Sequence, residues 1–256
     1  MDIKLNKQFI EEISEFETIY CLVSGGYHST ASALLLKDNG FKNVILIHNK
    51  TFLEMRSSLQ TMQLLQEKTN YPYIETEPDL KGETVWEIMK RSFQKIPEVR
   101  EDIINKKYNR KKFVCCTKLK KNPGDKFFKT IRTERMRIQD DFISFDYVVI
   151  DSSCPYESNR RSYYAMDLRN KNTYLRFLKK RKFWKAYPFR DVFSEKGFLS
   201  YLKSKGFHKI KHSGCVICPI LIVFKIYNER YYNSLKAMAR AGLPCFQKTI
   251  IDFMEV

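Results

Sequence analysis

The fold is decided by the stretch Thr18-Ile19-Tyr20-Cys21-Leu22-Val23-Ser24-Gly25-Gly26-Tyr27-His28-Ser29-Thr30-Ala31. An apolar, β-branched run ends in a Ser-Gly-Gly turn, and a small-residue pattern typical of a helix begins at Ser29. Two glycines let the backbone turn tightly, and the first amides of a helix favour a phosphate. The stretch therefore predicts a strand, an anion-binding loop and a helix, although such turns also serve as plain strand-to-helix connections.

Apolar runs alternate with helical patterns along the chain after this loop. We expect helices at residues 29–39, with Gly40 as the C-terminal cap, and at 52–68, 83–95 and 126–137, and strands at 44–47, 71–74, 147–150 and 182–188. Such alternation is typical of an α/β fold with a parallel sheet and helices on both faces. Ligands bind these sheets at the carboxyl ends of the strands, where we expect the glycine loop.

The C-terminal part of the chain changes in character. Residues 169–181 are polar and basic and are expected to form a surface excursion, and Ser194 is expected to cap a helix. An apolar and aromatic helix is expected at 220–241. We therefore predict one α/β domain over residues 1–219, which includes a cysteine-rich motif, and a helical C-terminal extension over residues 220–256 packed on it.

Positive charge is the strongest compositional bias. Lys and Arg total 46 against 29 Asp and Glu, a formal net charge of +17. This bias predicts a polyanionic partner such as nucleic acid or a nucleotide, unless the lysines only keep the surface soluble. Basic stretches lie beside aromatic residues, which suits single-stranded nucleic acid, and a solvated charged face is the alternative. The stretches are 106–107, 110–112, 118–121 and 179–182, and the aromatic residues are Tyr108, Phe113, Phe183 and Trp184.

Targeting signals and cysteine usage indicate the compartment. No apolar run approaches the roughly 20 residues that a membrane span needs, and residues 1–7 lack the apolar core of a signal peptide. We expect a cytoplasmic protein with no membrane partner. The 7 cysteines are odd in number and clustered, which indicates metal or redox chemistry rather than disulfides. Cys21 lies inside an apolar run and is expected to be core.

The remaining cysteines form a candidate metal set. Cys215-x-x-Cys218 has the spacing at which two thiolates hold one metal. Cys115 and Cys116 bring the number of thiols to four. Two adjacent cysteines do not readily bind the same metal, so Cys154 is an alternative ligand in place of Cys115. Zinc, an iron–sulfur cluster, a redox-active dithiol and buried cysteines without a ligand role are all open on spacing alone.

Five blocks of sequence follow one another in a fixed order over residues 19–219. They are Ser24-Gly25-Gly26-Tyr27-His28-Ser29-Thr30, Cys115-Cys116 with Lys118 and Lys120, Glu157-Ser158-x-x-Arg161, Tyr187-Pro188-Phe189 before the Ser194 helix, and Gly214-Cys215-x-x-Cys218-Pro219. The set resembles the PP-loop superfamily of adenine nucleotide α-hydrolases, and within it the phosphoadenosine phosphosulfate (PAPS) reductase-like branch. The resemblance implies a PP-loop, Rossmann-like α/β fold.

The chain departs from the family pattern at three places. Tyr27 and His28 replace the usual Lys-Asp of the loop, which removes a phosphate-pairing cation and a carboxylate. Ser152-Ser153-Cys154 stands where the family has Gly-x-Arg, so a phosphate-binding arginine is absent. The Glu-Cys-Gly-x-His ending of sulfonucleotide reductases is missing. The tail offers only Cys245, either as a mobile nucleophile or persulfide carrier or as a small residue packed at a helix start.

The resemblance implies a nucleotide site on the loop, with backbone amides and hydroxyls at the phosphate and Tyr27 or His28 over the ligand. Arg161 would pair with a phosphate and Glu157 would orient it. His48 follows a strand where a ligand can touch it, and His28 and Cys245 are the catalytic candidates. The nucleotide-site residues are Ser24, Gly25, Gly26, Tyr27, His28, Ser29, Thr30, His48, Glu157 and Arg161. The resemblance favours a 4Fe-4S cluster over zinc, held by Cys116, Cys215 and Cys218 with Cys115 or Cys154.

By analogy with the family, we expect an enzyme of sulfur transfer or sulfur reduction. It would bind ATP with magnesium and cleave it between the α and β phosphates to adenylate a target, or bind an adenosine phosphosulfate-type nucleotide and reduce it. The positive charge favours tRNA or DNA as the target, and a sulfur donor or thiol reductant protein and a second copy of the chain are further expected partners. The alternative is a nucleotide-sensing or nucleic-acid-binding module that has lost catalysis, as the replacement by Tyr27 and His28 permits.

Overall fold

A computed structural model describes residues 3–54, 56–105, 113–136, 147–157 and 159–208, together with residues 210 and 219. The chain divides into two compact units. The first unit comprises Met1–His48, Met55–Glu75 and Phe128–Ser213, and the second comprises Asn49–Glu54, Thr76–Phe127 and Gly214–Val256. The predicted boundary at residues 219 and 220 and the predicted helix at 220–241 lie outside the described residues, apart from residue 219.

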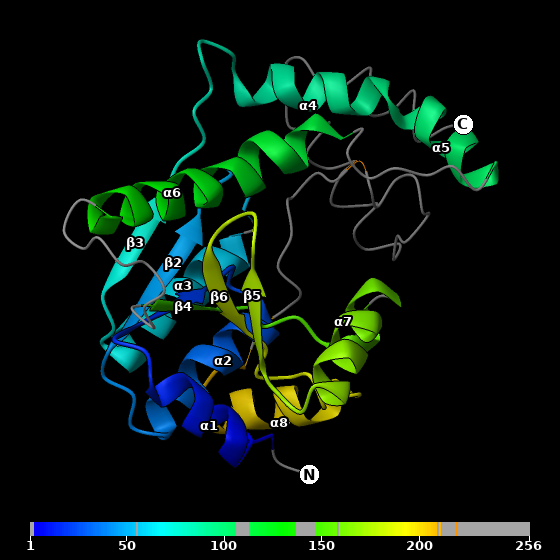
Figure 1. Ribbon diagram of the computed structural model, residues 1–256. Coiled ribbons are helices and arrows are strands. Elements are labelled where there is room, and N and C mark those ends of the chain that lie inside the picture. Colours follow the sequence, from blue (N-terminus) through cyan, green and yellow to red (C-terminus); the bar gives the residue numbers. More distant parts are fainter. Residues whose placement is uncertain are drawn as a thin grey trace. The chain divides into compact units, whose positions relative to one another are not determined.

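A six-stranded sheet in the order β3-β2-β1-β4-β6-β5 organises the chain (Figure 1). Its strands are β1 (Thr18–Leu22), β2 (Val44–Asn49), β3 (Tyr73–Thr76), β4 (Tyr147–Ile150), β5 (Leu175–Leu178) and β6 (Phe183–Ala186). β1 runs parallel to β2 and β4, and β4 runs parallel to β6, whereas β5 is antiparallel to β6. The prediction of an α/β fold built on a parallel sheet is confirmed, with one antiparallel strand at its edge.

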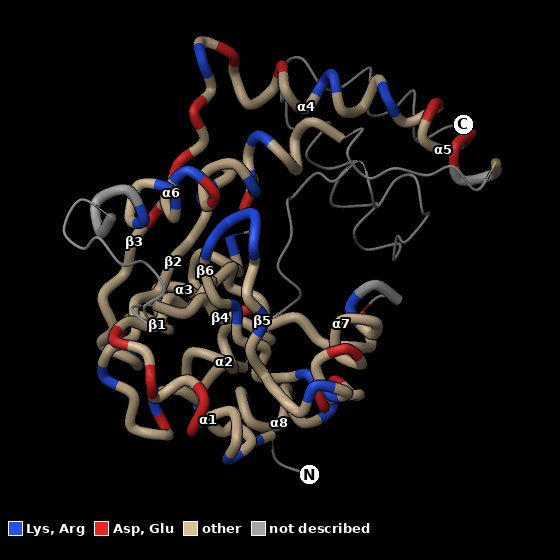
Figure 2. Tube along the Cα trace, in the orientation of Figure 1, with Lys and Arg blue, Asp and Glu red and all other residues tan. Residues whose placement is uncertain are grey.

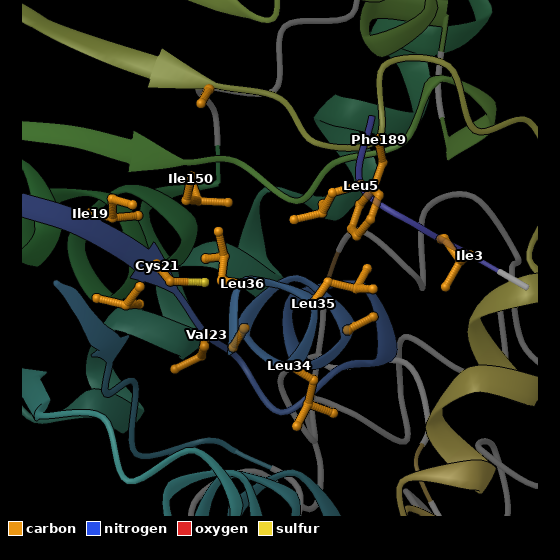
Figure 3. Close-up of a cluster of buried hydrophobic side chains, with 14 of the residues drawn as sticks. Ile3, Leu5, Ile19, Cys21, Val23, Leu34, Leu35, Leu36, Ile150 and Phe189 are labelled. Carbon is orange, nitrogen blue, oxygen red and sulfur yellow. The ribbon is translucent and has the colours of Figure 1, made fainter. Parts of the chain in front are cut away.

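One face of the sheet is covered by apolar helices. Ile19 and Cys21 of β1 and Ile150 of β4 pack in one cluster with Leu35 of α2 (Tyr27–Asp38) (Figure 3). α2 also contacts α3 (Arg56–Thr69) and α8 (Lys196–Ser204), and α1 (Lys7–Ser14) adds Phe9 to the same cluster. Burial raises the pKa of the Cys21 thiol to about 12. Cys21 is therefore a core residue, as the sequence predicts.

The opposite face is covered by aromatic side chains. Successive strand residues point to opposite faces, so Tyr20 lies on the other side of the sheet from its neighbours Ile19 and Cys21. The Tyr20 ring packs edge to face on Phe128 of α6 (Asn122–Met136), with 5.6 Å between ring centroids. Tyr147 and Phe183 complete this aromatic cluster. Helices therefore cover both faces, which confirms the predicted layering.

The predicted surface excursion at 169–181 is wrong in part. The segment contains β5. This strand lies at the edge of the sheet, pairs only with β6 and stays half exposed, so its sequence lacks a regular alternation of polar and apolar residues. The preceding helix, α7 (Asn159–Asn170), lacks an apolar stripe and was not predicted. The predicted cap is also displaced, because α8 begins after Glu195, although the Ser194 hydroxyl still accepts a hydrogen bond from the Lys196 amide at 3.3 Å.

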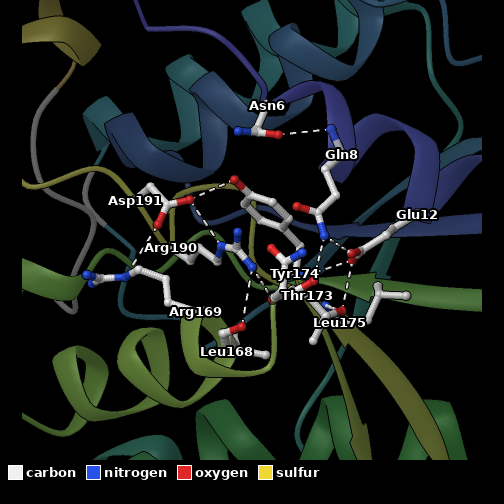
Figure 4. A network of polar contacts seen from close by, with 11 residues as sticks. Asn6, Gln8, Glu12, Leu168, Arg169, Thr173, Tyr174, Leu175, Arg190 and Asp191 are labelled. Carbon is white, nitrogen blue, oxygen red and sulfur yellow. Dashed lines mark hydrogen bonds and ion pairs between the residues drawn. The ribbon is translucent and has the colours of Figure 1, made fainter.

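A polar network holds α1, α7 and the ends of β5 and β6 together (Figure 4). The Glu12 carboxylate accepts hydrogen bonds from the Tyr174 amide at 2.8 Å and the Thr173 hydroxyl at 3.0 Å. Asp191 accepts from the Tyr174 hydroxyl at 2.7 Å and from Arg190 at 3.0 Å. Arg190 is almost fully buried, with its guanidinium 3.6 Å from the Tyr174 ring centroid. Through Arg190 and Asp191 the network holds the C-terminal end of α7 in place.

The second unit contains α4 (Val85–Gln94), α5 (Ile96–Ile104) and a π-helix, η2 (Cys116–Lys121), that leads into α6. Thr84 and Glu87 form a capping box at the start of α4, which confirms the helix predicted at 83–95. The Cys115 amide donates to the Ser92 hydroxyl at 3.0 Å, so the paired cysteines are anchored to α4. Among the described residues, no helix is long and apolar enough to cross a membrane.

Candidate site at the switch point of the sheet

The candidate site lies where the order of the strands reverses. From β1 the chain passes to β2 and β3 on one side, whereas β4, β6 and β5 lie on the other side of β1. Open α/β sheets bind ligands beside such a switch point, outside the carboxyl ends of the strands. The glycine loop follows β1 there, and the segment that begins at Asp151 follows the neighbouring strand β4.

The glycine loop has the backbone that the sequence predicts. Gly25 has a φ of +70°, and a Cβ at this position would lie 2.3 Å from the carbonyl oxygen of Ser58 in α3. The Gly26 carbonyl accepts hydrogen bonds from the Thr30 amide at 3.0 Å and the Ser29 hydroxyl at 3.1 Å. Gly26 is the N-cap of α2 and has no side chain to occupy the first helical amides. An anion fits this kind of helix start.

Tyr27 and His48 are placed inside the protein. The Tyr27 side chain is only 3% exposed, and its hydroxyl donates to Glu195 Oε1 at 2.6 Å while its ring packs on Phe198. Burial, followed by the Glu195 carboxylate, raises the Tyr27 pKa above its ordinary value, so the phenol stays neutral. His48 is also buried, with Nδ1 3.1 Å from the Val23 carbonyl.

His28 joins the loop to the Glu-Ser block. Its Nδ1 lies 3.6 Å from Glu157 Oε2, and its Nε2 contacts the Tyr156 hydroxyl. Glu157 ends the short helix η3 (Pro155–Glu157), accepts a hydrogen bond from the Cys154 amide at 2.6 Å and pairs with Arg161 in the first turns of α7. The structure thus brings together His28, Glu157 and Arg161, three of the predicted site residues from two distant blocks.

The predicted metal set is divided between described and undescribed parts of the chain. Cys154 is fully buried beside Glu157, and burial followed by that carboxylate raises the pKa of its thiol. Cys115 is buried and Cys116 is half-buried at the start of η2. Cys215, Cys218 and Cys245 lie outside the described residues.

Three features of the site were not predicted. Asp151 at the end of β4 pairs with Lys185 of β6 at 2.7 Å. Burial of the Asp151 carboxyl favours its neutral form, but Lys185 and hydrogen bonds from Ser153 outweigh burial and lower its pKa to about 2. Tyr156 and Glu195 also hold loop side chains in place. Polar residues directly after a buried strand are the signal that could have drawn attention to Asp151.

Arg161 lines a small pocket, and the segment after β4 holds an unpartnered hydroxyl. Ser152 Oγ is buried and has no hydrogen-bond partner among the described residues. Tyr187, from another of the five blocks, lies at the end of β6 and lines the pocket. The pocket is lined by Ser153, Pro155, Arg161, Tyr164, Ala165, Leu168, Tyr187 and Arg190.

Two aromatic residues proposed for base stacking are excluded by burial. Phe113 is 0% exposed and Phe183 is 4% exposed, so neither ring is accessible to a base. Trp184 is half-buried and packs on Phe177, an exposed ring that the sequence reasoning missed. Tyr108 lies outside the described residues.

No family model and no curated protein matches the chain. Among solved structures, it is similar to PAPS reductase from Candida auris in a phosphate complex, with 12% identity, a TM-score of 0.49, and coverage of 83% of this chain and 91% of that one. It is also similar to NH3-dependent NAD synthetase from Campylobacter jejuni, with 13% identity, a TM-score of 0.40 and coverage of 96% and 88%. A third similar structure is the U34-tRNA thiolase NcsA from Methanococcus maripaludis with its [4Fe-4S] cluster, with 10% identity, a TM-score of 0.40 and coverage of 96% and 76%.

These likenesses concern the backbone alone. The sheet order, the parallel pairing and the glycine loop at the end of β1 establish the architecture independently of them. The fold that the PP-loop resemblance implies is therefore present in this chain.

Proposed function

We propose that the first unit binds the phosphates of an adenine nucleotide at the switch point of the sheet. The observation that carries this proposal is the packing of His28, in the first turn of α2, against Glu157 and its ion-pair partner Arg161. This contact brings a glycine-rich helix start and an arginine to one edge of the sheet. Both are recurrent phosphate-binding elements.

Each group has a distinct part in this proposal. The first amides of α2 and the Ser24 hydroxyl would receive a phosphate, the Ser29 hydroxyl would brace the loop through Gly26, and the Arg161 guanidinium would pair with a second phosphate oxygen. Arg161 is 40% exposed in its side chain, so it is accessible to a ligand while Glu157 orients it.

The chemistry that follows from the five blocks is sulfur transfer or reduction with ATP or a sulfonucleotide. In this proposal a bound 4Fe-4S cluster would supply electrons or hold the transferred sulfur. Cys116, Cys215 and Cys218 would hold it, with Cys115 or Cys154 as the fourth ligand. The half-buried Cys116 lies at the start of η2 directly after Cys115, whereas Cys154 lies beside His28 and Glu157. Cys115 therefore fits the cluster better than Cys154.

A nucleotide-sensing module is the second candidate, and one observation favours it. Tyr27 and His28 are both engaged inside the protein, through Glu195 and through Tyr156 and Glu157. The loop therefore presents neither the cation nor the carboxylate of the family pattern to a ligand. Such a site retains the backbone amides for binding while it lacks two side chains for catalysis.

Nucleic acid is the partner that we propose for the basic turn, which we define as Lys179, Lys180, Arg181 and Lys182 between β5 and β6 (Figure 2). Phe177 precedes this turn on β5 and is 39% exposed, and its ring centroid lies 5.2 Å from that of Trp184. Adjacent cations and an exposed ring suit phosphate pairing and base stacking.

Calorimetric titration with ATP, adenosine phosphosulfate and its 3′-phosphorylated form tests the nucleotide site. Arg161→Gln should weaken binding about 10- to 100-fold, because a charge-assisted hydrogen bond is worth about 1.5–3 kcal/mol. Lys171→Gln is the matched control, since Lys171 follows the same helix, is exposed, and pairs only with Asp167 within the described residues. An unchanged dissociation constant in Arg161→Gln contradicts the proposal.

Pyrophosphate release from ATP, together with sulfite release from a sulfonucleotide in the presence of a thiol reductant, then separates the two candidate functions. Release of either product by the wild-type chain, alone or with RNA, supports the enzyme. Nucleotide binding without any release under either condition supports the sensing module.

A further inference from the structure

The three side chains of His28, Cys154 and Glu157 form a compact group of metal-ligating atoms. One nitrogen, one sulfur and one carboxylate oxygen all lie within 4.8 Å of one another. The group joins the first turn of α2 to the segment after β4, so it stands at the switch point of the sheet. Cys154 is fully buried, and the His28 and Glu157 side chains are 12% and 24% exposed.

Neighbouring groups orient two of these side chains. The Tyr156 hydroxyl occupies Nε2 of His28, which leaves Nδ1 on the side of Glu157 Oε2, 3.6 Å away. Arg161 pairs with the other carboxylate oxygen, Oε1, and Oε2 accepts a hydrogen bond from the Cys154 amide at 2.6 Å, which leaves Oε2 a second lone pair for a metal. Metal-binding histidines and carboxylates typically have such partners on the atoms that do not touch the metal.

We propose that His28, Cys154 and Glu157 bind a divalent cation of the zinc class. Zinc accepts nitrogen, thiolate and carboxylate ligands at about 2.0–2.3 Å, so tetrahedral donors lie about 3.3–3.7 Å apart. The separation of 3.6 Å between His28 and Glu157 already has this size, and a contraction of about 1 Å brings in the sulfur. Softer and harder metals fit less well, because the set mixes one thiolate with one carboxylate.

Three protein ligands leave one tetrahedral position for a water or a ligand atom, which is the pattern of catalytic rather than structural zinc. The open position would lie at the switch point, close to Arg161. This inference does not depend on nucleotide binding. It also assigns Cys154 to a site of its own and leaves Cys115 for the predicted cluster.

Metal content is the first test. The full chain is stripped with a chelator, dialysed against zinc alone, and analysed for bound zinc, in the wild type and in a Cys215→Ser, Cys218→Ser background that removes the Cys-x-x-Cys pair. Glu157→Gln and Cys154→Ser should each lose about one zinc per chain in both backgrounds. Glu195→Gln is the matched control, because Glu195 binds Tyr27 nearby and is not one of the three ligands. It should keep the full content.

Cobalt substitution is the second test and identifies the sulfur. The Cys215→Ser, Cys218→Ser protein loaded with cobalt should show tetrahedral d–d bands and a thiolate charge-transfer band, and Cys154→Ser should abolish the latter. Circular dichroism establishes that each variant is folded, and Glu157→Gln keeps the size of the side chain. The proposal is overturned if the folded wild type takes up no zinc, or if both ligand variants retain the wild-type amount.

Discussion

Replacement of Gly25 by alanine tests how closely the glycine loop is packed. A Cβ at Gly25 would lie 2.3 Å from the carbonyl oxygen and 2.7 Å from the Cα of Ser58, and the φ of Gly25 is +70°. The left-handed backbone costs an alanine about 1–2 kcal/mol. Because the obstructing atoms belong to the backbone of α3, overpacking adds about 1–3 kcal/mol. We expect Gly25→Ala to lower the free energy of unfolding by about 2–5 kcal/mol.

Gly40→Ala is the matched control for this prediction. Gly40 also has a positive φ, +81°, but a Cβ there would meet nothing within 4 Å. Its cost is therefore the backbone term alone, about 1–2 kcal/mol. Urea unfolding followed by circular dichroism gives the free energy for both variants and the wild type. An equal loss of stability in the two variants would refute the close packing of the loop against Ser58.

Three further predictions concern charge and metal binding. The pKa of Asp151 is about 2 in the folded protein against an ordinary 3.8. This shift contributes about 2 kcal/mol to the free energy of unfolding, which is fully present above pH of about 4 and is lost as the pH falls toward 2. Asp151→Asn should therefore flatten the dependence of stability on pH in this range, as measured by urea unfolding. Tyr156→Phe should weaken zinc binding about 10- to 100-fold in competition with a chelating dye, because the His28 ring loses its orienting partner; an unchanged affinity contradicts the orienting role. Lys180→Gln in the basic turn should lower the salt dependence of RNA binding by about one phosphate contact, and Lys171→Gln should not.

The sequence predicts the centre of the sheet well and its edge poorly. β1 and α2 lie in the buried middle of the fold, where apolar periodicity is strong, and a glycine loop marks the transition between them. β5 and α7 are half exposed and rich in polar residues, so their patterns resemble those of loops. Their structure comes from tertiary partners, namely β6 for the strand and the Arg190 network for the helix.

The sequence predicts which segments form the candidate site but not which side chains contact one another there. His28, Glu157 and Arg161 are named by the resemblance, and the parallel order of β1 and β4 brings them together. Tyr156 and Glu195 were missed because they contact loop residues across 128 and 168 positions of sequence, a separation at which no local pattern operates. Cys154 was predicted only as a substitute for Cys115 in the metal set, and in the structure it lies beside His28 and Glu157.

The same contacts give a physical account of the loop's departure from the family pattern. A lysine and an aspartate at positions 27 and 28 would point charges toward a ligand, whereas Tyr27 and His28 satisfy two acidic groups of the protein, Glu195 and Glu157. Tyr27 and His28 are therefore held by carboxylates of the protein, one of which, Glu157, belongs to the Glu-Ser-x-x-Arg block itself. Reversion by His28→Asp alone would place a carboxylate about 4 Å from Glu157, where two like charges repel. Adding Glu157→Gln removes this repulsion, so the double change should be less destabilising than the sum of the single ones.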